Sequence, residues 1–318
     1  MKQSLKLISI VVPCYNESPS IDSLYQELCK VMEHDSTHRY ELLYINDGSQ
    51  DETLSKLQAL AASDERVHVL SLSKNFGKEI ATTAGIQYAS GDAVIMLDAD
   101  GQHPPNRLPE FVQAWEQGAR VVTGVRNFYR KEGAVKKYLS KLFYRLLQRL
   151  TGTHVVMGAT DFRLIDKTVQ QELLRMTERS RMTRGLIDWM GFSQTYIYYD
   201  ENPRLNGTAN YSYAKLFSLA LNSFISLSLK PLYFAFYTGL VIMPLSLLLA
   251  LACGLEMVIG DPLQLNITGT AYLVMLALFL LGLVLISQGI TALYLSHIHT
   301  ETQNRPLFIV DAANSRGV

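Results

Sequence analysis

Two carboxylates one residue apart follow a short apolar run in the stretch VIMLDADGQHPP, residues 94–105. A continuous apolar run of this kind predicts a buried strand, and the prolines that follow mark where it ends. Asp98 and Asp100 are therefore expected at the carboxyl edge of a sheet, where open α/β folds bind their ligands. Carboxylates this close repel one another and lose hydration, so a divalent metal is the expected counter-charge.

Polar residues also end two earlier predicted strands. The motif VVPCYNES closes the first strand and INDGSQDET closes the second, which places Asp47 and its polar neighbours at the same edge as Asp98 and Asp100. A turn followed by a helix cap explains the second motif locally, and that role is compatible with Asp47 also facing a ligand. A lone D-x-D triplet carries little weight, so its position beside these two motifs is what indicates a site.

The elements that position these residues alternate along the first half of the chain. Strands are predicted at residues 7–15, 40–47, 67–73, 92–100 and 120–125, and helices at 20–33, 51–62, 78–89 and 106–117. This alternation predicts a mostly parallel sheet with helices on both faces. No G-x-G-x-x-G follows the first strand, and NFGKE lacks the first glycine and the hydroxyl of a phosphate-binding loop. Dinucleotide-binding and ATPase folds are therefore disfavoured.

Charge is distributed unevenly along the chain. Lys plus Arg and Asp plus Glu both total 29, so no overall excess points to nucleic acid. No charged residue occurs between Lys230 and Glu256 or between Asp261 and Glu301, and each gap exceeds the roughly 20 residues that cross a bilayer. Three scattered cysteines form neither a disulfide framework nor a zinc pattern, which fits a reducing compartment. The chain is expected to join a cytosol-type domain to a C-terminal membrane anchor.

The predicted organisation runs from a soluble domain to a membrane hairpin. It comprises a catalytic domain at 1–211 that contains a basic amphipathic interface helix at 131–150, a juxtamembrane amphipathic helix at 212–230, spans at 231–256 and 270–296, an extracytoplasmic loop at 257–269 and a cytoplasmic tail at 297–318. The loop region carries acids and no Lys or Arg, whereas Lys215, Lys230 and Arg305 flank the spans. The positive-inside rule then places the catalytic domain on the cytoplasmic face of a multi-pass inner-membrane protein. The basic helix indicates contact with anionic lipid.

The motifs IVVPCYNES, INDGSQDET, NFGKEIATTAGIQYASGDAVIMLDADGQHPP, GATDFRLID, RGLIDWMGF and RLNGTANYSYAKL occur in this order before the spans. This series resembles family 2 glycosyltransferases and, within them, the polyprenyl-phosphate glycosyltransferases. Among these it is similar to dolichyl-phosphate mannose synthase and, more closely, to the bactoprenol glucosyltransferases of O-antigen modification. The resemblance covers nearly the whole chain. It implies a GT-A, Rossmann-like catalytic domain, a nucleoside-diphosphate sugar donor and Mg²⁺ or Mn²⁺. His103 departs from the pattern, because many relatives carry Asp there.

The resemblance also implies roles for individual residues. By similarity, the nucleotide-sugar pocket is lined by Pro13, Tyr15, Glu17 and Asp47. Asp98 would contact the nucleotide side and, with Asp100, the metal on the diphosphate, and Gln102 would lie beside that metal. A metal at this position is chemically reasonable, because a cation at the bridging oxygens stabilises the charge that a departing diphosphate accumulates.

Asp161 lies in the motif GATDFRLID at the start of a further predicted strand. Its residue type alone allows a helix cap or an ion pair, for example with Arg163, whereas the resemblance places it in the active site near the acceptor and sugar. A phosphate monoester has a second pKa of about 6 and is largely dianionic at neutral pH, so we expect Asp161 to orient groups rather than remove a proton. The planar guanidinium group of arginine can donate two hydrogen bonds to such a phosphate, and the expected phosphate ligands are Arg126, Arg184 and Arg204.

The leading hypothesis is inverting transfer of a hexose, glucose from UDP-glucose, to undecaprenyl or another polyprenyl phosphate, giving a lipid-linked donor for cell-surface glycans. The expected partners are a UDP-hexose, polyprenyl phosphate, membrane lipids, a separate flippase and downstream glycosyltransferase, and further copies of the chain. Mannose, galactose or modified arabinose remain alternatives to glucose. A processive polysaccharide synthase is disfavoured because Q-x-x-R-W is absent and only two spans are predicted. A non-catalytic sugar-nucleotide scaffold is the third alternative, against which the intact carboxylates argue.

Overall fold

The computed structural model of the 318-residue chain describes residues 5–127, 156, 158–179, 181–200, 237, 241, 244, 248 and 269–317. The chain divides into two compact units. The first comprises residues 1–148, 152–210 and 305–318, and the second comprises residues 149–151 and 211–304. The first unit contains the sheet and the candidate site.

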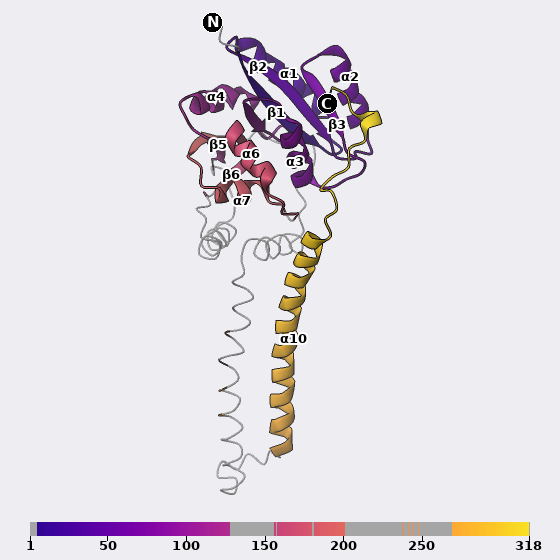
Figure 1. Cartoon of the computed structure of the whole chain (residues 1–318), viewed down its shortest axis with the longest axis vertical. Coiled ribbons are helices and arrows are strands. Elements are labelled where there is room, and N and C mark those ends of the chain that lie inside the picture. The colour runs from indigo at the N-terminus through magenta and orange to yellow at the C-terminus, as the bar shows by residue number, and fades with distance from the viewer. Residues whose placement is uncertain are drawn as a thin grey trace. The chain divides into compact units, whose positions relative to one another are not determined.

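The first unit is built on a seven-stranded sheet in the order β3-β2-β1-β4-β6-β5-β7 (Figure 1). The strands are β1 Lys6–Cys14, β2 His38–Asn46, β3 Val67–Ser71, β4 Ala93–Met96, β5 Val121–Arg126, β6 Ala159–Asp166 and β7 Gln194–Tyr199. Strand β6 runs antiparallel to both of its neighbours, and the other pairs are parallel. The mostly parallel sheet predicted from the sequence is confirmed, with this one reversal that makes it mixed.

Helices cover both faces of the sheet, as the strand–helix alternation predicts. One face carries α1 Ile21–His34, α2 Thr53–Ser63, the 3-10 turn η1 Pro105–Arg107 and α4 Leu108–Glu116, and the other carries α3 Lys78–Tyr88, α6 Lys167–Arg175 and α7 Thr183–Trp189. Helix α1 shows the cause, because Ile21, Leu24 and Leu28 recur at helical spacing and are all buried. The result is a three-layer α/β/α domain with a hydrophobic core on each side of the sheet.

Close packing of α3 fixes where its first residue lies. A Cβ atom on Gly85 would meet Val11 Cγ1 at 2.3 Å and Ile45 Cδ1 at 2.6 Å, so only glycine permits this approach to β1 and β2. The helix begins at Lys78, after a connection from the end of β3. In a parallel α/β fold this connection lies at the carboxyl edge of the sheet. Lys78 is thereby held at the edge where Asp98 and Asp100 follow β4.

Several elements differ from the sequence predictions. Strand β4 ends at Met96, so Asp98 and Asp100 lie in the turn after the strand rather than within it. Helices α6 and α7 and strand β7 were not among the predicted elements. The motif RGLIDWMGF supplies most of α7, and the short run QTYIYY forms β7 at the edge of the sheet.

The C-terminal segment returns to the sheet and covers its β3 edge. Residues 309–316 run antiparallel to β3 and to the two residues that follow it, in yellow in Figure 1. The backbone hydrogen bonds are Ser73 N to Ile309 O at 2.9 Å, Asp311 N to Ser71 O at 2.8 Å, Val69 N to Arg316 O at 2.9 Å and Arg316 N to Val69 O at 2.8 Å. Residues 305–318, which the sequence analysis assigned to a tail after the second span, therefore belong to the sheet-containing unit, and the helix that precedes them continues to Thr302.

The second unit contains one long apolar helix, α10 Gly269–Thr302, within which Phe279–Thr302 is long and apolar enough to cross a membrane. It covers the second predicted span, 270–296. The basic helix at 131–150, the juxtamembrane helix at 212–230 and the loop before Gly269 lie outside the described residues. So does the first predicted span, 231–256, except at four helical positions, Tyr237, Val241, Pro244 and Leu248.

Candidate active site

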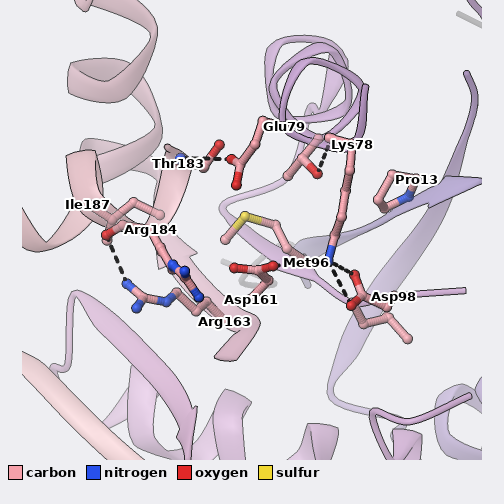
Figure 2. A pocket seen from close by; sticks show the side chains of 12 residues that line it. Pro13, Lys78, Glu79, Met96, Asp98, Asp161, Arg163, Thr183, Arg184 and Ile187 are labelled. Atoms are coloured by element: carbon pink, nitrogen blue, oxygen red, sulfur yellow. Dashed lines mark hydrogen bonds and ion pairs between the residues drawn. The ribbon is translucent and has the colours of Figure 1, made fainter. Parts of the chain in front are cut away.

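The candidate site lies where the strand order changes direction. Strands β1 and β4 are parallel neighbours, but the chain leaves β1 toward β2 on one side and leaves β4 toward the other half of the sheet. Such a switch point is where open α/β sheets bind ligands. A pocket opens there, and β1, α3, the turn after β4, β6 and α7 all contribute to its walls (Figure 2). Its polar side chains and one proline are Pro13, Lys78, Glu79, Thr82, Asp98, Asp161, Arg163, Thr183 and Arg184.

Lys78 bridges the two pocket carboxylates. Its Nζ lies 2.6 Å from Asp98 Oδ1 and 2.9 Å from Asp161 Oδ2. Burial on its own would lower the pKa of Lys78, but the charges and hydrogen bonds of Asp98 and Asp161 outweigh it and raise the pKa above its ordinary value. The ammonium is therefore charged, and it holds the carboxylate of the turn after β4 and the carboxylate of β6 at a fixed separation.

Asp161 is an ionised carboxylate surrounded by cations. Burial would raise its pKa, but the positive charges of Lys78, Arg184 and Arg163, together with the hydrogen bond from Lys78, lower the pKa below its ordinary value. Figure 2 shows its carboxylate between the Lys78 and Arg184 side chains. Of the alternatives that the sequence left open for Asp161, the structure shows an ion pair, with the ammonium of Lys78 as its partner; the guanidinium of Arg163, named as an example, is paired with Asp188.

Arg163 instead fastens α7 to β6. Its side chain is 2% exposed, and Nη1 lies 2.7 Å from Asp188 Oδ1. The same guanidinium donates from Nε to Thr160 O at 3.1 Å and from Nη1 to Arg184 O at 3.4 Å. A buried guanidinium needs a paired carboxylate and further acceptors, and here α7 provides Asp188 and Arg184 O while β6 provides Thr160 O. Through these contacts Arg163 fixes the backbone from which Arg184 reaches the pocket.

Asp47 supports the loop that carries Lys78. The residue is 2% exposed, and its two carboxylate oxygens accept from Phe76 N at 2.7 Å and Gly77 N at 2.9 Å. Burial raises the pKa of Asp47, although these two hydrogen bonds oppose the effect. Gly77 has φ of +96°, a conformation that glycine adopts readily. The nucleotide contact expected for Asp47 stays a prediction, and its observed contacts shape the start of α3.

The D-x-D turn is organised by its own backbone. Asp98 N donates to His103 Nδ1 at 3.0 Å, and Gln102 N donates to Asp100 Oδ1 at 3.1 Å. His103 is 5% exposed and stacks on Phe162 at 5.1 Å between ring centroids. Burial lowers the pKa of His103, so the ring is neutral and shapes the turn from the core. His103 thus holds the D-x-D turn together.

The turn residues fit a hard divalent cation. Asp98, Asp100 and Gln102 present oxygen donors, which Mg²⁺ and Mn²⁺ prefer. Within the described part of the chain, no group of three or more His, Cys, Asp or Glu side chains is arranged to hold a metal. Two carboxylates suit an ion that keeps waters and substrate phosphate oxygens as its remaining ligands. The carboxylate of Asp98 already binds one cation in this structure, the ammonium of Lys78, which agrees with a cation-binding role for this turn.

The other predicted residues are placed as follows. Tyr15 follows β1 and is 44% exposed at the same sheet edge. Glu17 accepts from Ser20 Oγ through Oε2 at 2.9 Å. Arg126 ends β5, where its backbone N donates to Gly158 O at 2.9 Å, and Arg204 lies outside the described residues.

The structure brings four of the predicted residues into one pocket: Pro13, Asp98, Asp161 and Arg184. The sequence interpretation assigned no role in the site to Lys78, Glu79 or Arg163. Glu79 Oε2 accepts from Thr183 N at 2.8 Å and so joins α3 to α7. The signal for the first two was the motif NFGKE, which places charged residues at the start of a helix on the same sheet edge.

Sequence comparisons identify the group to which this chain belongs. The glycosyl transferase family 2 signature matches residues 9–174. An uncharacterized glycosyltransferase of Synechocystis is 38% identical over 303 residues, which cover 95% of this chain and 94% of its own. The SfII prophage-derived bactoprenol glucosyl transferase of Shigella flexneri is 34% identical over 304 residues, or 95% and 97% of the two chains.

A solved structure was also found to be similar. Glucosyl-3-phosphoglycerate synthase from Mycobacterium tuberculosis, in complex with Mn²⁺, UDP and glucosyl-3-phosphoglycerate, is 19% identical and covers 70% of this chain and 78% of its own, with a TM-score of 0.48. The family signature spans more than half of the chain, and relatives share about a third of its residues over nearly its whole length. The chain therefore belongs to glycosyl transferase family 2 and is a glycosyltransferase with a GT-A fold.

Proposed function

We propose that this glycosyltransferase transfers glucose from UDP-glucose to a polyprenyl phosphate, with inversion at the anomeric carbon. The name of the Shigella relative, a bactoprenol glucosyl transferase, supports both the sugar and the lipid class. The observation that carries the proposal is the state of Asp161, which Lys78 Nζ holds at 2.9 Å and which has a lowered pKa. A carboxylate so engaged is a poor general base, so the site suits an acceptor that is already anionic.

On the donor side, Asp98, Asp100 and Gln102 would hold Mg²⁺ or Mn²⁺. When bound, that ion would neutralise the charge that develops on the departing diphosphate. Pro13, Tyr15, Glu17 and Asp47 follow or end the neighbouring strands and are the proposed nucleotide side of the site. His103 keeps the D-x-D turn in place through its hydrogen bond from Asp98 N.

On the acceptor side, a phosphate oxygen of the lipid attacks the anomeric carbon as the bond from that carbon to UDP breaks. Arg184 is the proposed phosphate ligand in the pocket, because guanidinium geometry matches phosphate oxygens. Arg126 and Arg204 are proposed to assist from the end of β5 and from the segment after β7. Asp161 orients this arrangement by holding Lys78, and no residue is assigned to remove a proton.

The membrane part is proposed to be a two-span hairpin with the catalytic domain on the cytoplasmic face. The apolar stretch of α10 supports one span, and the uncharged run at 231–256 supports the other. The lysines and arginine that flank the two runs support the orientation. A lipid phosphate at the membrane surface would then be within reach of the enzyme, and the glucosylated lipid would serve as a donor for later glycosylation of surface glycans.

Purified full-length protein, labelled UDP-glucose and undecaprenyl phosphate test the function directly. We expect radiolabel in the lipid fraction with the phosphate and none with the matching free polyprenol. Parallel reactions with UDP-galactose, GDP-mannose and a UDP-linked modified arabinose identify the preferred sugar. Efficient glucosylation of the free polyprenol, or extension of a glycan chain, would refute the proposed acceptor.

A further inference from the structure

The strongest unassigned feature of the site is a lysine placed on the carboxylate that a metal would need. Lys78 Nζ lies 2.6 Å from Asp98 Oδ1 and 2.8 Å from Asp98 Oδ2, so one ammonium engages both oxygens. Figure 2 shows the Lys78 side chain extending from α3 down to this carboxylate. A cation cannot bind those oxygens at full strength while the ammonium occupies them, because the two positive charges would repel each other at close range.

The loop that carries Lys78 is held rigidly, so this placement is fixed by the fold. Asp47 accepts from both Phe76 N and Gly77 N immediately before Lys78, and Glu79 immediately after it accepts from Thr183 N at 2.8 Å. The backbone on both sides of Lys78 is therefore anchored. The flexible four-carbon side chain is the part that can move, and it can redirect three donors without moving the helix.

We propose that Lys78 is the resident counter-cation of the site, which neutralises Asp98 and Asp161 before the donor binds and then transfers from Asp98 to a phosphate oxygen of the metal-bound donor. The proposal rests on the proposed function in one respect, namely that a metal and a nucleoside diphosphate bind here. Its logic is charge balance. With a metal bound, Asp98 would be neutralised by that ion, and the ammonium of Lys78 would be free to act as a charge-assisted donor to the incoming anionic diphosphate.

Arg163 cannot fill this role, although it also lines the pocket. Its guanidinium is 2% exposed and committed to Asp188 at 2.7 Å. Lys78 is about half exposed and touches two carboxylates of the pocket itself. Among the cations described in the pocket, Lys78 is the one in contact with a proposed metal ligand.

The test compares Mn²⁺ and UDP binding by the wild-type full-length protein and by Lys78→Met, with no sugar transfer measured. Free Mn²⁺ is followed by its electron paramagnetic resonance signal, first without nucleotide. We expect Lys78→Met to bind Mn²⁺ about tenfold more tightly, because a competing charge has been removed. UDP binding at saturating Mn²⁺, followed by calorimetry, is expected to weaken about tenfold, because a phosphate contact has been lost. The opposite signs of these two changes are the signature of a transferred cation.

Lys74→Met is the matched control, because Lys74 belongs to the same loop and its Nζ lies 5.1 Å from the centroid of the Phe76 ring rather than on a carboxylate. Lys74→Met is expected to leave both affinities within twofold of wild type, which corresponds to a change in binding free energy of about 0.4 kcal/mol. Thermal unfolding checks that each variant is folded. If Lys78→Met does not fold, Lys78→Gln replaces it, since Gln keeps hydrogen bonding but removes the charge.

Unchanged or weaker nucleotide-free Mn²⁺ binding in Lys78→Met would overturn the counter-cation role. Tighter Mn²⁺ binding with unchanged UDP affinity would overturn the transfer to phosphate. Neither result depends on which sugar or acceptor the enzyme uses. A protein that shows both opposite shifts but does not glucosylate polyprenyl phosphate would disprove the proposed function and leave this inference standing.

Discussion

Asp161 illustrates how the surroundings of a carboxylate decide its chemistry. The same residue type could act as a base, a cap or a charge partner, and its position between Lys78 and Arg184 selects the last of these. Its pKa is lowered because the neighbouring positive charges outweigh the effect of burial. Asp161 therefore stays ionised through the range in which a lipid phosphate takes up its second proton, and the two groups should be distinguishable by pH.

The first prediction concerns that pH dependence. The rate of glucosyl transfer should rise through the second ionisation of the acceptor phosphate, at about pH 6, and then level off. Initial rates between pH 5 and pH 8 measure it, with the donor saturating. A polyprenyl thiophosphate, which ionises at lower pH, should move the acidic limb downward. If the acidic limb of the pH–rate profile stays at the same pH when the thiophosphate replaces the phosphate, the ionisation belongs to the protein instead.

The second prediction concerns the metal side. Asp100→Ala should lower kcat at least roughly a hundredfold, since a bound cation contributes several kcal/mol of charge stabilisation to the departing diphosphate. Wild-type protein in EDTA should be equally inactive and should recover when Mg²⁺ or Mn²⁺ is restored. The fold should persist, because Asp100 lies in an outer turn and is not part of either hydrophobic core. Full activity in EDTA would remove the metal from the mechanism.

At the scale of elements, the parts that the sequence predicts are those with local signals. Short sequence patterns determine several elements: apolar runs form β1, β2 and β4, and the apolar spacing forms α1. The position of Asp98 at the carboxyl edge of the sheet could therefore be predicted. The partner of Asp161 could not, because Lys78 lies 83 residues away and meets it only through the packing of α3 on the sheet. The same holds for β7, whose six residues gain their place by pairing with β5.

The third prediction tests the ion pair that fastens α7. Asp188→Ala leaves the nearly buried Arg163 guanidinium without its carboxylate, and it should reduce the free energy of unfolding by about 3 kcal/mol. Thermal and urea unfolding of the full-length protein provide the measurement. The double variant Arg163→Met with Asp188→Leu should recover most of the loss, because neither buried charge remains. Equal instability of single and double variants would show that packing rather than charge is responsible.

The fourth prediction tests the backbone pairing of the C-terminal segment with β3. Asp311→Pro removes the N–H that donates to Ser71 O at 2.8 Å, and it should cost about 1 kcal/mol of unfolding free energy relative to Asp311→Ala. The alanine variant is the matched control, because it also loses the side-chain contact to Asn314 but keeps the backbone donor. Asp311 already has φ of −87°, close to the value that proline requires. Identical stability of the two variants would mean that this hydrogen bond does not hold the segment.

At the scale of the whole molecule, the proposed hairpin sets the side of the membrane on which each part of the chain lies, and this topology can be measured. The fifth prediction is that a reporter inserted between Gly260 and Gly269 is found outside the cytoplasm, whereas reporters at either terminus are found inside. Enzymatic reporters that are active on only one side of the membrane give the readout. A cytoplasmic signal from the Gly260–Gly269 insertion would contradict the hairpin.

The pairing of residues 309–316 with β3 has a consequence for the number of times the chain crosses a bilayer. Strand β7 lies before most of the second unit in the chain and the paired segment lies after it, yet both belong to one sheet-containing domain. A single folded domain occupies one side of a membrane. The path between Tyr199 and Ile309 therefore begins and ends in the same compartment, and such a path crosses a lipid bilayer an even number of times, zero included. If α10 is one crossing, parity demands another, whatever the charges at the helix ends.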